Sequence, residues 1–353
     1  MNPTRDQLAV FRRHCEENGL PFDKWRAFWH KDGQYSSFFV NAEAEEQEKK
    51  DREEFLARLN KKAPTVKRKP LPHHTLAVFA NFDVHIGKHC ELLRTGHEYT
   101  PDKAVEQVIA GQDALYELIK PFKVTDILLP LGNDIVHVDN NRNTTTSGTP
   151  QDAYGSVESQ MMLAAELYVK TINRLAKHHN VWLCHVHSNH DRVSGWAVSE
   201  MVRHYYLGNK NPRVHVDAGN FSQTHRKYFV FGNSLIMFHH GEMRKEERLL
   251  GLIKSEANKG MAETNRVYVY QGDTHHKTVS KRGVSSEQTE KDHSGLTVIQ
   301  SGKGAVNQMH VETVRSPSPP DDWHARSGYY NFPGIEVFLH NTDSQFARFT
   351  HWF

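Results

Sequence analysis

The chain has 353 residues, of which 37% are hydrophobic, so it has apolar material for a real core and length for roughly two domains. Lys plus Arg number 44 against 42 for Asp plus Glu, and the net charge of +2 does not by itself indicate a nucleic-acid binder. The cysteines Cys15, Cys90 and Cys184 form no CxxC pair, which argues against a disulfide framework and favours a reducing, cytoplasmic setting. We expect no signal peptide and no membrane span, because no stretch approaches the about 20 apolar residues that a bilayer requires.

Residues 1–40 are predicted to form a small, mostly helical module. Thr4 and Gln7 form a capping box at the start of a helix over residues 4–18, and Gly19 ends it. A second short helix with an aromatic interior follows. The pair resembles a helix-turn-helix arrangement whose basic residues would face a phosphate backbone, but a packing module that binds no DNA fits the same pattern.

Residues 41–73 are predicted to form a charged helix and then a linker. Three prolines and five basic residues lie within residues 61–72, which is typical of extended, exposed chain. We therefore place a domain boundary here and expect one larger domain over residues 74–353.

The larger domain is predicted to alternate strands with helices, which indicates an α/β fold. Strands crowd together after residue 213 and predict a second, more antiparallel sheet, while residues 280–294 read as a loop or a weak hairpin. The expected strands are 75–81, 125–131, 181–187, 227–231, 234–239, 266–271, 296–300 and 334–340, and the expected helices are 101–120, 152–178 and 196–206.

Polar residues gather directly after five of these strands. Open α/β sheets place their ligands at the carboxyl ends of their strands, so the clusters are expected to meet at one edge. Imidazole, carboxylate and amide oxygen without thiolate suit Mn²⁺, Fe or Zn²⁺, and the ligands are too many for one ion. Two ions about 3.5–4 Å apart that share a carboxylate would use them, although any one histidine could be a plain core residue. The clusters are residues 83–85, 132–134, 189–192, 239–241 and 272–276.

In order, these clusters read Asp-x-His, Gly-Asn-Asp, Asn-His-Asp, His-Gly and Gly-x-x-His, and over about residues 74–340 they resemble the calcineurin-like metallophosphoesterases. The resemblance implies a two-sheet β-sandwich flanked by helices, in four layers αββα. Residues 132–140 and the threonine-rich residues 144–150 resemble a bacteriophage-encoded branch related to DNA-repair nucleases, which would place the protein in the cytoplasm of a host cell.

The resemblance also implies a role for each site residue. Asp134 would bridge the two ions, and His190 would act near the leaving group as general acid or hydrogen-bond donor, oriented by Asp191. The implied metal ligands are Asp83, His85, Asp134, Asn189, His240, Asp273 and His275. The residues expected beside the substrate or behind the ligands are Asn133, His137, Asp139, Asn140, Arg142, His239 and His276.

The last motif departs from the family pattern Gly-His-x-His. Asp273 stands where a histidine of the second metal is expected. A carboxylate is a competent, harder ligand, so the second site is either preserved with a shifted metal preference or weakened.

We therefore predict a phosphoester hydrolase with two divalent ions, Mn²⁺ first and Fe, Zn²⁺ or Mg²⁺ as alternatives. A phosphodiesterase or nuclease that acts on DNA is the favoured reading. The alternatives are a phosphomonoesterase that acts on protein or nucleotide, and a DNA-binding or assembly factor with a vestigial metal site. The sequence does not indicate the oligomeric state.

Overall fold

The structure is a computed structural model that describes residues 5–17, 19, 46, 49–50, 53, 74–242, 246–273, 278–283, 308–322 and 332–353. The chain divides into two compact units, residues 1–61 and 62–353. In the first unit, helix α1 (Arg5–Glu17) follows the prediction, with Cys15 buried and Gly19 beyond its end at a φ of 65°. Most of the module predicted over 1–40, and nearly all of the charged helix and linker predicted over 41–73, lie outside the described residues, so those boundaries stay predictions.

The first of two sheets in the second unit carries the first three polar clusters. Its six strands lie in the order β11–β10–β1–β2–β3–β4. The strands β1 (Leu76–Ala80), β2 (Asp126–Gly132), β3 (Asn180–Val186) and β4 (Val214–His215) run parallel, and β10 (Gly334–His340) and β11 (Gln345–Trp352) add antiparallel to the edge of β1. Because Leu76 lies opposite Asp126 and Asp126 opposite Asn180, the central strands start level and end at the same edge.

The second sheet has five strands in the order β5–β6–β7–β9–β8. They are β5 (Lys227–Phe231), β6 (Ser234–Phe238), β7 (Arg266–Gln271), β8 (Thr278–Gly283) and β9 (Gln308–Thr313). The expected antiparallel character is only partly correct, because β6, β7 and β9 run parallel and only the flanking β5 and β8 are antiparallel. The strand at 334–340 joins the first sheet instead, and the strand predicted at 296–300 lies outside the described residues.

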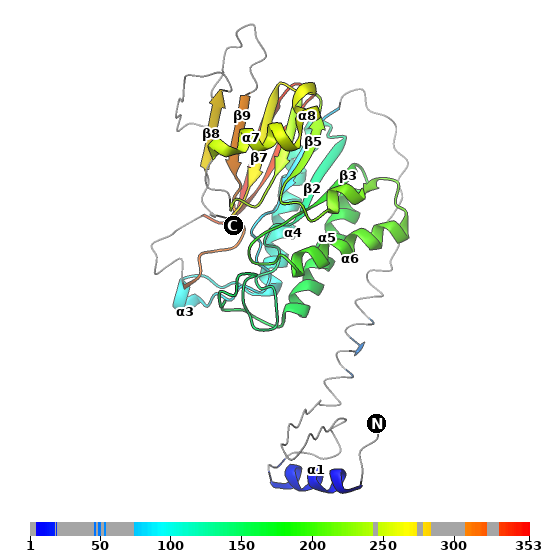
Figure 1. Cartoon of the computed structure of the whole chain (residues 1–353), viewed down its shortest axis with the longest axis vertical. Helices are drawn as coiled ribbons and strands as arrows, with labels where there is room; N and C mark the ends of the chain where they lie inside the picture. Colours follow the sequence, from blue (N-terminus) through cyan, green and yellow to red (C-terminus); the bar gives the residue numbers. More distant parts are fainter. Residues whose placement is uncertain are drawn as a thin grey trace. The chain divides into compact units, whose positions relative to one another are not determined.

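Helices cover the outer faces of both sheets (Figure 1). Helices α4 (Pro101–Ile119), α5 (Val157–Leu175) and α6 (Ser194–Asn209) pack on the first sheet. Helices α7 (Glu246–Glu256) and α8 (Asn258–Glu263) cover the second, where Ile253 and Met261 join the same buried cluster as Val267. Short turns of helix complete the unit: α3 (Leu92–Thr95), η2 (Lys120–Phe122) and η3 (Ala218–Phe221).

The inner faces of the two sheets share one hydrophobic core. Val78 and Leu128 of the first sheet lie in one buried cluster with Phe238 and Tyr270 of the second. Burying each such side chain contributes about 1.5–3 kcal/mol, which fixes the two sheets face to face. The layers are therefore helix, sheet, sheet and helix, and the predicted α/β sandwich is confirmed.

The predicted helix bounds hold to within a few residues, with one instructive exception. Helix α5 begins at Val157 rather than at residue 152, because the Ser156 side chain accepts a hydrogen bond from the Ser159 N–H and caps the helix there. Among the described helices, none has both the length and the apolar character needed to cross a bilayer.

Candidate metal centre

The loops after five strands meet at one edge of the sandwich and are hydrogen-bonded to one another. The N–H of Asp83, after β1, donates to the carbonyl of Asn133, after β2, at 2.9 Å, and the Asn133 N–H donates to Val186 at the end of β3 at 2.9 Å. In the second sheet, the Gly272 N–H donates to the His240 carbonyl at 2.6 Å. These backbone bonds set the side chains of the loops in fixed positions relative to one another.

Left-handed backbone is concentrated in these loops. The φ angles are 55° at Asp83, 50° at His85, 57° at Asn133, 59° at Asp134 and 72° at Asp273. This conformation costs a residue with a Cβ roughly 1–2 kcal/mol, although Asn and Asp tolerate it best. Within the described chain only three other non-glycine residues have positive φ, so strain gathers where the polar residues do, as is typical of functional sites.

Asp83, His85 and Asp134 form the first group of potential ligands. Their ligand atoms all lie within 4.8 Å of one another, and all three side chains are buried. The N–H of Asp273 donates to Asp83 Oδ1 at 3.2 Å. Gly272 is required beside it, because a Cβ at that position would lie 2.5 Å from Asp83 Oδ2.

A second group of potential ligands surrounds His240, which shares the oxygen Asp134 Oδ2 with His85. His240 Nε2 lies 2.8 Å from Asn189 Oδ1 and 3.3 Å from Asp134 Oδ2. Asp273 Oδ1 is 3.7 Å from the same nitrogen, so its carboxylate faces the place where the family pattern has a histidine. His275 and His276 lie outside the described residues, and their roles stay predictions.

Asn133 has a role that the sequence did not reveal. Its side-chain oxygen accepts a hydrogen bond from Nδ1 of His240, which turns Nε2 of that ring toward Asp134 and Asn189. Asn also suits the left-handed backbone at this position.

The buried carboxylates of the site are stabilised by positive charge, as the pKa values of the site residues show. Burial, with the charges of Asp134 and Asp273, raises the pKa of Asp83 to about 8. Burial opposes a charge on His240, but Asp134, Asp83 and Asp273 raise the pKa of that imidazole to about 10. For Asp134, burial favours protonation, yet His240 and His190 lower its pKa below the ordinary value.

The folded chain therefore takes up protons at the place where its oxygen and nitrogen ligands converge. A divalent cation supplies the same positive charge, and carboxylate, imidazole and amide oxygen are a donor set for Mn²⁺, Fe or Zn²⁺. The residues present fit a metal centre on this ground.

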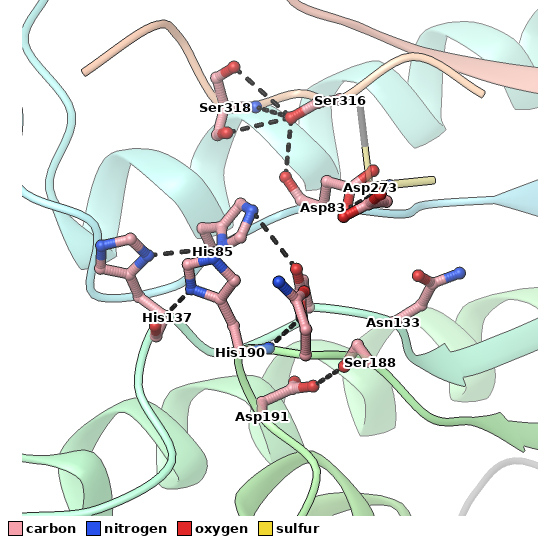
Figure 2. A network of polar contacts seen from close by, with 12 residues as sticks. Asp83, His85, Asn133, His137, Ser188, His190, Asp191, Asp273, Ser316 and Ser318 are labelled. Atoms are coloured by element: carbon pink, nitrogen blue, oxygen red, sulfur yellow. Dashed lines mark hydrogen bonds and ion pairs between the residues drawn. The ribbon is translucent and has the colours of Figure 1, made fainter. Parts of the chain in front are cut away.

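Three imidazoles converge next to the first group (Figure 2). His137 Nδ1 lies 3.3 Å from His85 Nδ1, and the rings of His137 and His190 stack at 5.4 Å between centroids. Burial, with the charges of His190 and Lys88, lowers the pKa of His137 well below its ordinary value and keeps that ring neutral. The ligand atoms of the three histidines also lie within 4.8 Å of one another, so His137 is close enough to them to contribute a ligand atom.

The expected partner of His190 is corrected by the structure. The ring nitrogen Nδ1 of His190 donates to the carbonyl of His137 at 3.0 Å, and the backbone N–H of His190 donates to Asp134 Oδ1 at 3.0 Å. Asp191 instead accepts a hydrogen bond from the Ser188 hydroxyl (Figure 2). It accepts a second one from the Val136 N–H at 3.1 Å. Burial and the charge of Asp134 raise the pKa of Asp191 to about 7. Asp191 therefore holds the turn that carries His190, and it does not orient the imidazole ring of His190.

Asp139, expected beside the substrate or behind the ligands, holds the start of helix α6. Its Oδ1 accepts from the N–H groups of Val193 and Ser194 at 2.8 Å each, and Oδ2 accepts from Thr146 at 2.8 Å. A carboxylate at a helix N-terminus satisfies donors that have no partner within the helix.

The other residues expected around the ligands are spread over different places. Asn140 donates to the Thr144 hydroxyl at 2.8 Å within its own loop, and Arg142 is exposed. His239 is buried beside His240, and burial together with the charge of that neighbour lowers its pKa to about 3. His239 is not among the grouped histidine and carboxylate ligand atoms of the described residues.

The segment after β9, residues 314–321, forms one wall of the centre. The Ser316 hydroxyl donates to the Asp83 carbonyl at 2.8 Å, as Figure 2 shows. Lys88 is 1% exposed, and its ammonium group binds the Pro319 carbonyl at 2.8 Å and Asp321 Oδ2 at 3.2 Å. A lysine so close behind the buried Asp-x-His cluster was the one signal in the sequence that this wall would be anchored.

Comparisons with known proteins add little to the geometry. Comparison with protein-family models found no match, and no curated protein matches the chain. Among solved structures, Vps29 from Chaetomium thermophilum is similar at 12% identity over 78% of this chain and 98% of that one, with a TM-score of 0.30. PhoD is similar at 10% identity over 78% of this chain and 65% of that one, also with a TM-score of 0.30.

Proposed function

We propose that the protein is a metal-dependent phosphoester hydrolase with two divalent ions, and that its substrate is a phosphodiester of DNA. The observation that carries the first part is the sharing of Asp134 between two groups of ligands, one with Asp83 and His85 and one around His240. The motifs and their order in the sequence support the same reading.

When bound, two ions at such a site lower the pKa of a nucleophilic water and neutralise charge on the phosphoryl oxygens. The chain supplies the remaining functions. Asp83, His85, Asp134, Asn189, His240, Asp273 and His275 would hold the ions, Mn²⁺ first.

His190 is the residue best placed to assist a leaving group. It is only partly buried, and its Nδ1 is taken up by the His137 carbonyl. When the imidazole is protonated, its Nε2–H can donate a proton or a hydrogen bond to the departing oxygen.

DNA is proposed from sequence features alone. The stretch that resembles a phage-encoded branch, the basic linker and the helical start of the chain favour a polyanionic substrate. A phosphomonoester of a protein or nucleotide is the second candidate, because the ligand groups described above would serve it equally well.

The experiment is a hydrolysis assay with Mn²⁺ that compares linear duplex DNA, single-stranded DNA and a simple phosphomonoester. We expect DNA cleavage, and we expect Asp134→Ala to lower it by more than about a hundredfold, since loss of even an outer partner of a metal ligand costs about 10–100-fold. Turnover of the monoester alone would move the assignment to a phosphatase.

A metal count on the purified proteins gives a readout that does not depend on activity. Wild type should hold about two ions per chain and Asp134→Ala fewer, because that carboxylate is the one shared ligand. Equal metal content and full activity in Asp134→Ala would sink the proposal, and a metal-free wild type without activity would favour a vestigial site.

A further inference from the structure

A cavity opens between the starts of helices α5 and α6, and its lining includes residues that follow His137 and His190 in the chain. Its volume is about 590 Å³, which lies within the range of about 300–1,000 Å³ that is typical of small-molecule pockets. The lining residues that matter below are Asn141, Arg142, Val157, Met161, Val193 and Ala197.

Two parts of the cavity lining belong to the loops that carry His137 and His190. Asp139, in the lining, lies two residues after His137, and Val193 lies three residues after His190. At about 3.8 Å between successive Cα atoms, both walls begin within roughly 12 Å of those histidines along the backbone. A group bound in the cavity is therefore within reach of a phosphate at the metal centre, on the side of His190.

The floor of the cavity is apolar. Val157, Met161, Val193 and Ala197 contribute it, and Val193 is 62% exposed, although it is a branched apolar residue. Such a surface in a hollow next to a polar centre is suited to a flat, weakly hydrated ligand.

The polar side of the cavity is suited to a ligand that carries an anion and a planar group. The carboxylate oxygens of Asp139 are already engaged by the N–H groups of Val193 and Ser194 and by the Thr146 hydroxyl, so they are held against the start of helix α6. Within the described residues no ion pair or side-chain hydrogen bond occupies the guanidinium of Arg142, which is exposed at the mouth. A guanidinium both stacks on aromatic rings and binds phosphate.

An apolar floor, a stacking cation and a nearby phosphate site together match one class of ligand. We propose that this cavity holds the base of the nucleoside on the leaving-group side of the scissile phosphodiester, with Arg142 over the base or on the adjoining phosphate. This assignment rests on the proposed function. An aliphatic chain would make no favourable contact with the guanidinium of Arg142, and a bare phosphate would leave the apolar floor of the cavity uncovered.

The test measures binding without catalysis, so that it does not depend on turnover. Thymidine and deoxyadenosine are titrated against the full chain without added metal, and ligand-observed NMR gives the Kd. Ala197→Phe fills the floor with a ring, and Ala110→Phe places the same ring on an exposed position of helix α4 as the matched control. Arg142→Ala, a change at an exposed side chain, provides a second variant.

We expect both nucleosides to bind wild type and Ala110→Phe alike and to lose at least about tenfold in affinity in Ala197→Phe, because the added ring takes the space of the base. Arg142→Ala should weaken both nucleosides, and 2-deoxyribose alone should bind none of the proteins. No binding to wild type, or binding that neither variant weakens, would overturn the cavity assignment.

The DNA hydrolysis assay separates the two proposals. Hydrolysis without nucleoside binding overturns the cavity assignment and leaves the proposed function standing. Nucleoside binding without hydrolysis of any phosphodiester overturns the proposed function, and with it the place of the cavity beside a leaving group.

Discussion

At the scale of single residues, the absence of a side chain at position 272 is as important as the ligands themselves. A Cβ there would lie 2.5 Å from Asp83 Oδ2, and the backbone on both sides is tied to the His240 carbonyl and to Asp83. We predict that Gly272→Ala displaces the Asp83 carboxylate and weakens metal binding by about 10–100-fold, as loss of ligand support does elsewhere. Titration of the metal-free protein with Mn²⁺ measures this.

The matched control is Gly208→Ala in helix α6, where an added Cβ meets nothing within 4 Å. This change should leave metal affinity as it is and stabilise the protein by about 0.5–1 kcal/mol through helix propensity. Equal metal affinities in the two variants would contradict the role given to Gly272.

Residue types and their spacing predict which residues are candidate metal ligands, but they do not predict how the side chains are oriented. The clusters after the strands made Asp83, Asp134 and His240 candidates, and the structure brings them together. The Asn133–His240 bond and the position of Asp191 depend on left-handed backbone and on which turn each side chain faces. Local sequence does not encode such three-dimensional detail.

At the scale of elements, a buried lysine helps to hold the segment after β9 to the site, together with the Ser316 bond to Asp83. Lys88 contacts the Pro319 carbonyl and Asp321, and removal of one partner of a buried ion pair typically costs about 3–5 kcal/mol. We predict that Lys88→Met lowers the free energy of unfolding by about 3 kcal/mol, near the lower end because Asp321 is 20% exposed. Urea denaturation measures the loss.

Lys103→Met is the control for this change, because Lys103 pairs with Glu98 on the surface. An exposed pair contributes about 0–1 kcal/mol, so this variant should stay close to wild type. A loss in Lys88→Met no larger than that in Lys103→Met would show that the buried pair does not anchor the segment.

The elements themselves were predictable where hydrophobic periodicity is strong. Strand β7 and helix α4 agree with the sequence to within a residue. Strands β9 and β11 were missed, because β9 reads Gln-Met-His-Val-Glu-Thr and β11 carries Arg348 and His351, with too little apolar character to stand out. Their strand conformation comes from pairing with β7 and β10, which is a tertiary effect.

At the scale of the whole molecule, the two sheets enclose histidines that the folded state keeps neutral. His340 of β10 is fully buried, and its Nε2 lies 2.7 Å from the hydroxyl of Tyr270 on the opposing sheet. Burial, with the charge of His310, lowers the pKa of His340 to about 3. The unfolded chain keeps the ordinary value of about 6.5, so as the pH falls below 6.5 protons bind the unfolded state first.

This histidine therefore stabilises the fold fully above pH 6.5, and its contribution is lost as the pH falls toward 3. At pH 5 the loss amounts to about 2 kcal/mol, from about 1.36 kcal/mol for each of 1.5 pH units. His340→Gln keeps a partner for Tyr270 but cannot titrate. We predict that wild type loses about 2 kcal/mol more than His340→Gln between pH 7 and pH 5, measured by urea denaturation at each pH, because the buried imidazole is the only titrating group that differs between them. If the free energy of unfolding changed with pH in the same way in both proteins, His340 would have to be protonated in the folded state at pH 5. The interface between the sheets would then accommodate a charge, contrary to what the burial of His340 predicts.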